Sequence, residues 1–108
     1  MVMMYAPHTL YIRRESEVRD KFNRVVSKDT HWERVCRCRC DDNSETEFRD
    51  DNGAFYKPNY HVVLEGRHRI KSGTYVRCMD GEEVRGEGVA KRPKTLNLLE
   101  YSEIWILK

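Results

Sequence analysis

Long apolar runs are absent from this sequence of 108 residues. A membrane-spanning helix needs roughly 18 or more consecutive apolar residues, and no segment approaches that length. The opening residues Met1–Met4 are too few for the apolar part of a secretory signal peptide, and no small-residue cleavage site follows them. The sequence therefore predicts neither contact with a membrane nor secretion.

A large excess of one charge is also absent. The 20 lysine and arginine residues are nearly balanced by 18 aspartate and glutamate residues, so the formal net charge is +2. That excess is too small to indicate nucleic-acid binding by itself. Hydrophobic residues make up 39% of the chain, which is too many for a disordered segment, so we expect one folded domain over residues 1–108.

A sustained helical pattern and an internal repeat are both missing, and short alternating segments take their place. Side chains on a strand point to its two faces in turn, so apolar residues at every second position predict half-buried strands. The predicted strands are Thr9–Arg14, Thr30–Asp41, Asn59–Leu64, Thr74–Met79, Val84–Lys91 and Tyr101–Leu107. The fold class is therefore all-β: a small antiparallel β-barrel or sandwich of about six to seven strands with long loops, after a flexible lead-in over residues 1–8.

Three segments between these strands are harder to assign. The segment Glu15–Lys28 is expected to be a charged loop or a short helix, because its apolar residues Val18, Phe22, Val25 and Val26 have helical spacing. His68–Ile70 predicts a short strand or a turn, and Arg92–Leu99 predicts a loop. Gly86 and Gly88 interrupt a strand and indicate a bulge or a barrel corner.

Four cysteines are present, but not at the spacings of a zinc site or a local disulfide. Cys36, Cys38 and Cys40 alternate with arginines, and residues two apart on a strand lie about 6.5–7 Å apart, at or beyond the usual disulfide limit. Structural zinc sites typically hold two cysteines on one turn, two to four residues apart. We favour reduced cysteines buried in a core, in a reducing cytosol, and keep a zinc or redox site as the alternative.

The same alternation predicts which side chains form the core. Trp32 and Arg34 share the cysteine face of their strand, and Arg34 is the exception there, which needs an open strand end or a carboxylate partner. The predicted core residues are Leu10, Ile12, Trp32, Cys36, Cys38, Val62, Leu64, Val76, Cys78, Ile104 and Ile106.

Motifs for catalysis and for cation binding are missing. The four histidines are scattered, and no nucleophile motif accompanies them. The acidic pairs Asp41-Asp42 and Asp50-Asp51 lack the spacing of a calcium-binding EF-hand loop, which favours a solvated loop. We therefore expect no enzyme activity, no cofactor and no bound metal.

The most acidic segment, residues 41–53, predicts a long exposed hairpin tip. Asn52-Gly53 favours a tight turn, so Thr46–Arg49 and Ala54–Tyr56 are expected to form the two arms of a small ribbon. The candidate functional residues of this segment are Asp41, Asp42, Glu45, Glu47, Phe48, Asp50 and Asp51.

Basic residues interleaved with aromatic ones leave a second function open. On a small barrel, such residues can form a face that binds oligonucleotides, although the nearly neutral charge favours an ordinary solvated surface. The residues concerned are Arg67, Arg69, Lys71, Lys91, Arg92 and Lys94, with Tyr56, Tyr60 and Tyr75.

In order and length, the chain resembles the small head–tail joining proteins of tailed phages and prophages, also called head-closure or stopper proteins. The segments that carry the resemblance are Pro7–Arg14, Asp29–Cys38, Tyr60–Gly66, Gly73–Cys78 with Asp80-Gly81, Gly86–Lys91 and Glu103–Trp105.

The resemblance implies a structural virion protein of the phage neck, made in the bacterial cytoplasm. Such proteins form a ring, typically dodecameric or hexameric, at the junction of the portal or adaptor with the tail proteins, where they retain packaged DNA without reading its sequence. The loop Asp42–Asn52 is then the candidate for a segment that projects into the channel, because a ring of carboxylates repels DNA phosphates. Alternatively, these carboxylates pair with a basic patch on a neighbouring subunit.

Overall fold

The computed structural model describes residues 5–95 and 100–108, and every regular element in that part of the chain is a β-strand. The prediction of an all-β fold is therefore confirmed. The strands are β1 (His8–Arg19), β2 (Val25–Asp42), β3 (Phe48–Arg49), β4 (Phe55–Tyr56), β5 (Tyr60–Glu65), β6 (Tyr75–Asp80), β7 (Glu83–Thr95) and β8 (Tyr101–Leu107). In the described residues, no helix is long and apolar enough to cross a membrane.

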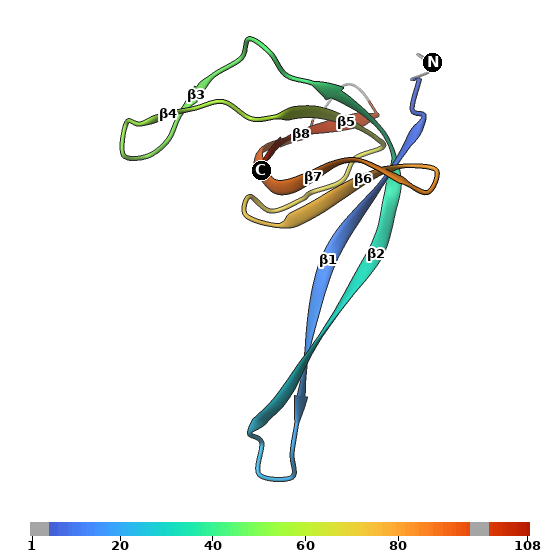
Figure 1. The fold of residues 1–108 in the computed structure, drawn as a ribbon, viewed down its shortest axis with the longest axis vertical. Helices are drawn as coiled ribbons and strands as arrows, with labels where there is room; N and C mark the ends of the chain where they lie inside the picture. The colour runs from blue at the N-terminus through green and yellow to red at the C-terminus, as the bar shows by residue number, and fades with distance from the viewer. Residues whose placement is uncertain (1–4, 96–99) are drawn as a thin grey trace.

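Six of the strands pair in the order β1-β2-β5-β8-β7-β6 to form a closed antiparallel barrel (Figure 1). The barrel closes where β6 pairs back with β1, with Leu10 opposite Cys78. The short strands β3 and β4 form a separate two-stranded ribbon. At Gly88 an added Cβ would lie 2.5 Å from the carbonyl oxygen of Leu107, so a side chain there would force β7 away from β8. The bulge expected near Gly86 is present, because Cys78 pairs with Gly86 and Met79 with Val84.

The interior of the barrel holds the core. Every predicted core residue except Trp32 is buried, and Cys40, Ile70 and Ala90 join them. Cys36, Cys38 and Cys40 all face inward, as the spacing of two predicts. The cysteine side chains of β2 therefore pack into the barrel interior as small apolar groups.

Trp32 lies outside the core, which corrects the prediction. Leu10 pairs with Cys36 but Tyr11 pairs with Arg34, so Val35 is an extra residue in a β-bulge. A one-residue shift exchanges the two faces of a strand, and the residues before the bulge no longer share the cysteine face. The same bulge explains Arg34, which is exposed and needs no buried carboxylate.

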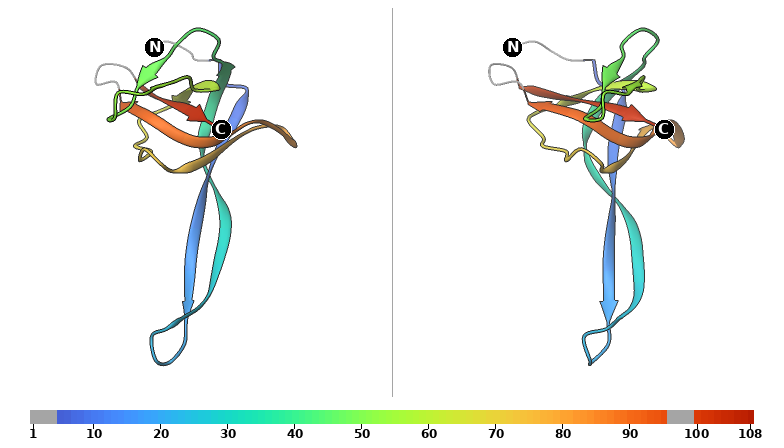
Figure 2. Two further views of the ribbon diagram at one scale, coloured as in Figure 1. Left: turned by 60° about the vertical axis from the view of Figure 1, so that its left-hand side comes forward. Right: turned by 90° about the vertical axis from the view of Figure 1, so that its left-hand side faces the viewer.

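The expected charged loop or short helix at Glu15–Lys28 is wrong. β1 and β2 continue as a paired hairpin well beyond the barrel, from Arg14 opposite His31 to Arg19 opposite Val25. Figure 1 shows this hairpin extending away from the barrel, and both views in Figure 2 show that it stands free of the other strands. We call residues 15–30 the arm.

The structure also refines three other sequence predictions. His68–Ile70 has no regular structure, and its last residue, Ile70, is buried. In the predicted loop Arg92–Leu99, residues 92–95 belong to β7, which continues past an irregularity between Lys91 and Lys94, whereas residues 96–99 lie outside the described residues. In the predicted lead-in, residues 1–4 also lie outside them, while His8 begins β1 and accepts a hydrogen bond at Nδ1 from the backbone N–H of Cys40, at 3.0 Å.

Candidate interaction surfaces

The β3–β4 ribbon is held on the barrel by one of its two faces. Phe48 lies opposite Tyr56 in the ribbon, and its ring packs edge-on against Trp105 of β8, with 5.0 Å between ring centroids. The guanidinium of Arg92 lies 4.3 Å above the same Phe48 ring. Phe48, predicted as a functional residue, therefore attaches the ribbon to the barrel.

The outer face of the ribbon consists of the other residue pair, Arg49 opposite Phe55. Side chains alternate between the faces of a ribbon, so this pair points away from the face that meets Trp105. Phe55 is 66% exposed, and the guanidinium of Arg49 lies 4.7 Å from its ring centroid. The ribbon thus presents an apolar side chain to its surroundings.

The predicted acidic residues divide into two groups. Some have structural partners: Asp50 Oδ1 accepts hydrogen bonds from the backbone N–H groups of Asn52 and Ala54, both at 2.9 Å. Together with Gly53 at φ 82°, these bonds confirm the tight turn. Asp41 pairs with Arg39 at 3.0 Å and Asp42 pairs with Arg85 at 3.1 Å. Among the described residues, no hydrogen bond or ion pair engages the exposed carboxylates of Glu45, Glu47 and Asp51.

The tip of the arm is an ordered turn. Asp20 Oδ1 accepts hydrogen bonds from the N–H groups of Phe22, at 2.8 Å, and Arg24, at 3.0 Å. These backbone donors hold the pKa of Asp20 below its usual value, and the N–H of Arg24 has the largest effect. Asn23 adopts φ 61°, a left-handed conformation that asparagine tolerates well.

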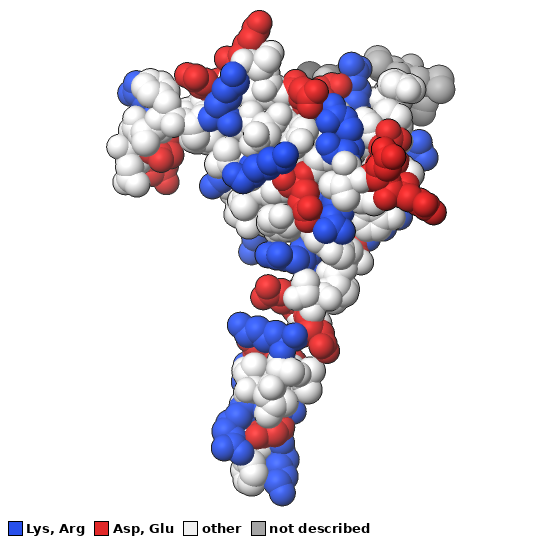
Figure 3. Space-filling model, viewed as in Figure 1, with Lys and Arg blue, Asp and Glu red and all other residues white. Residues whose placement is uncertain are grey.

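Four apolar side chains around this turn face solvent. Phe22 is 66% and Val26 59% exposed, and Val18 and Val25 are also exposed. Lys21 and Arg24 place cations about 5.2 Å from the Phe22 ring centroid. Figure 3 shows that lysines and arginines predominate over the outer part of the arm on the face drawn there. Apolar side chains with no core to enter are typical of a contact surface.

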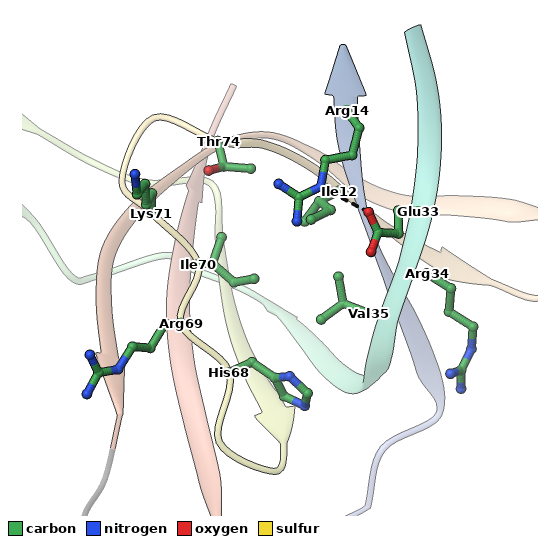
Figure 4. A pocket seen from close by; sticks show the side chains of 10 residues that line it. All are labelled: Ile12, Arg14, Glu33, Arg34, Val35, His68, Arg69, Ile70, Lys71 and Thr74. Carbon is green, nitrogen blue, oxygen red and sulfur yellow. Dashed lines mark hydrogen bonds and ion pairs between the residues drawn. The ribbon is translucent and has the colours of Figure 1, made fainter. Parts of the chain in front are cut away.

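A cavity of about 440 Å³ opens at the base of the arm, where β1 and β2 leave the barrel. Its floor consists of Ile12, Val35 and Ile70, which Figure 4 shows at the centre of the cavity. The polar lining residues surround this floor: Arg14, Glu33, Arg34, His68, Arg69, Lys71 and Thr74. Four of them are cationic and only Glu33 is acidic, so the rim is positive.

The cysteines are free thiols in the core. Cys38 Sγ lies 3.8 Å from Cys78 Sγ, which is hydrogen-bond distance for thiols. Hydrogen bonds to the Cys38 and Cys40 thiols, together with burial, raise the pKa of Cys78, and burial raises the pKa of Cys36 to about 12. Within the described part of the chain, no three His, Cys, Asp or Glu side chains are grouped so as to hold a metal ion.

The residues of the predicted oligonucleotide face are divided. Arg69 and Lys71 line the cavity at the base of the arm, whereas Lys91, Arg92 and Tyr56 line a second cavity of about 270 Å³ beside the ribbon. A further aromatic group lies on the outer face of the barrel, with the rings of Trp32 and Tyr75 6.1 Å apart. Arginines already cover these rings: Arg13 lies over Tyr75 and Arg77 over Trp32.

Sequence reasoning identified the ribbon but missed the arm tip and the cavity. The apolar residues of the arm have helical spacing and not the alternation of a strand, and the cavity joins three segments that are remote in sequence. No family model, curated protein or solved structure matches this chain.

Proposed function

We propose that this chain is a structural assembly protein that forms a ring in the neck of a tailed phage or prophage virion. The observation that carries the proposal is the arm, a paired hairpin with exposed apolar residues at an ordered tip. The extended chain from Arg14 to Arg19 covers about 17 Å at ~3.3 Å per residue. An arm of this length presents apolar surface to another protein while the barrel stays folded.

The molecule has two projections on different sides, which suits assembly into a ring. In Figure 1 the arm extends downwards from the barrel and the ribbon lies at the upper left. Contacts between two different surfaces of identical subunits are heterologous, and they generate rings when the rotation closes. In a ring, one projection contacts the next copy of the chain. The other projection contacts a neighbouring ring, which is either the portal or adaptor or the tail.

The charge distribution suits a position beside packaged DNA. The carboxylates Glu45, Glu47 and Asp51 of the ribbon segment are exposed, and wherever they face the channel they repel phosphates. A surface of this kind neither reads the DNA sequence nor holds the DNA tightly. The proposed role requires neither a cofactor nor catalysis.

The test is to combine the purified chain with the portal and adaptor proteins encoded near its gene. We expect weak self-association alone and a ring visible by negative-stain electron microscopy on the portal–adaptor complex. Failure to bind that complex, together with tight salt-sensitive binding to a single-stranded oligonucleotide, would instead identify the chain as a small nucleic-acid-binding barrel.

A further inference from the structure

The cavity at the base of the arm has an apolar floor that the chain leaves unfilled. Ile12 and Ile70 are buried beneath it, and Val35 packs against the core from the β2 bulge. A volume of about 440 Å³ is ample for one aromatic side chain, and filling it would remove apolar surface from water.

Three of the four cations at the rim of this cavity have no partner among the described residues. Arg14 pairs with Glu33 at 2.9 Å. In the described part of the chain, no hydrogen bond or ion pair engages the side chains of Arg34, Arg69 or Lys71. Figure 4 shows Arg34 and Arg69 on opposite sides of the cavity, with their guanidinium groups pointing outwards from its floor. An occupant with an apolar centre and flanking carboxylates therefore fits this site.

The ribbon segment, residues 43–56, has that composition. Phe55 is its exposed apolar side chain. Residues 43–56 hold the carboxylates Glu45, Glu47, Asp50 and Asp51 and one cation, Arg49, which is the inverse of the charges around the cavity. The two surfaces are thus complementary in both charge and polarity.

Within one chain, Phe55 is not among the residues that line the cavity. Phe48 holds the ribbon against Trp105, and Phe55 lies on the opposite face of the ribbon. The cavity, in contrast, lies at the base of the arm, between β1, β2 and the segment before β6. Contact between the two surfaces therefore needs a second copy of the chain.

We propose that the ribbon of one copy inserts Phe55 into the arm-base cavity of the next copy. The ribbon carboxylates then face Arg34, Arg69 and Lys71. The inference rests on the proposed self-assembly and names the surfaces that perform it. Because the two surfaces differ, the contact is heterologous and repeats from copy to copy.

The first test exchanges charges across the contact. R69E/K71E and E47K/D51K should each weaken self-association about tenfold, as measured by sedimentation velocity over a range of protein concentrations, since two exposed ion pairs are lost. An equimolar mixture of the two variants should recover association, because each supplies a surface that complements the other. K21E/K28E makes the same charge change on the arm as R69E/K71E, and should associate like the wild-type chain.

A crosslink locates the contact. Replacing Phe55 with photoreactive p-benzoylphenylalanine in a mixture of ¹⁴N- and ¹⁵N-labelled chains should give mixed-label crosslinks to residues 68–74. Every substituted position is exposed, so each variant should fold, and circular dichroism verifies this.

The outcomes separate the two proposals. A wild-type chain that associates while R69E/K71E associates equally well overturns this contact and leaves the assembly role standing. A wild-type chain that stays monomeric at every concentration, both alone and with the portal–adaptor complex, overturns both.

Discussion

At the scale of single residues, the buried thiols make stability depend on pH in the alkaline range. Cys36 faces the core at 7% exposure, and burial raises the pKa of its thiol from 9.0 to about 12. In the unfolded chain the thiol loses its proton near pH 9, whereas the folded chain keeps it. The unfolded state then binds fewer protons, so stability falls as pH rises.

We predict that Cys36→Ala removes part of this dependence. Between pH 9 and pH 12 the Cys36 thiol contributes a loss of about 1.4 kcal/mol in the free energy of unfolding for each pH unit. Urea denaturation of both proteins at several pH values measures the two slopes, and below pH 8 their difference in stability should be constant. Parallel slopes above pH 9 would show that Cys36 ionises freely in the folded protein.

The burial of individual residues was predictable where strand alternation was unbroken. Cys36, Cys38 and Cys40 follow a spacing of two and all face inward. The prediction for Trp32 is wrong because the extra residue Val35 inverts the alternation, and no glycine marks a bulge there. The position of Arg34 on the cysteine face was the only hint that the pattern had shifted.

At the scale of elements, the ribbon was predictable from its sequence and the arm was not. Asn52-Gly53 is a strong turn signal, and it predicted the ribbon with both of its strands. The arm has no buried face, so its strands lack the apolar alternation on which strand prediction rests. Its pairing becomes visible only once the register of β1 with β2 is known.

We predict that the arm can be removed without unfolding the barrel. Arg14 lies opposite His31, so replacing residues 15–30 with Asn-Gly gives a two-residue hairpin at the barrel edge. Every arm residue except Asp20 is exposed, so the free energy of unfolding should change by less than ~1 kcal/mol.

Thermal and urea denaturation test this, with Leu64→Ala as the comparison. Leu64 is fully buried, and its truncation should cost about 2–5 kcal/mol. A loss of similar size on arm removal would mean that the arm supports the barrel. The arm-free chain should lose binding to the portal–adaptor complex and keep its self-association, since the ribbon and cavity remain.

At the scale of the whole molecule, a nearly neutral chain has its charges separated in space. The net charge is +2, yet the ribbon segment is acidic and the rim of the cavity is positive. Composition alone suggested no charged partner, because the net charge does not show that acidic and basic residues lie on different surfaces. The cavity was equally hidden in the sequence, since its floor joins Ile12, Val35 and Ile70 from three segments.

This separation predicts how self-association responds to salt. If ribbon carboxylates meet cavity cations, the association constant should fall about tenfold or more as salt rises from 0.1 M to 1 M, because the Debye length shrinks from about 10 Å to about 3 Å. Contact through the apolar arm tips would not weaken in this way, since Val18, Phe22, Val25 and Val26 carry no charge. Sedimentation at several salt concentrations distinguishes the two, and the arm-free chain provides the control. If association of the full chain survives 1 M salt but disappears when the arm is removed, the apolar tip is the surface that joins the copies.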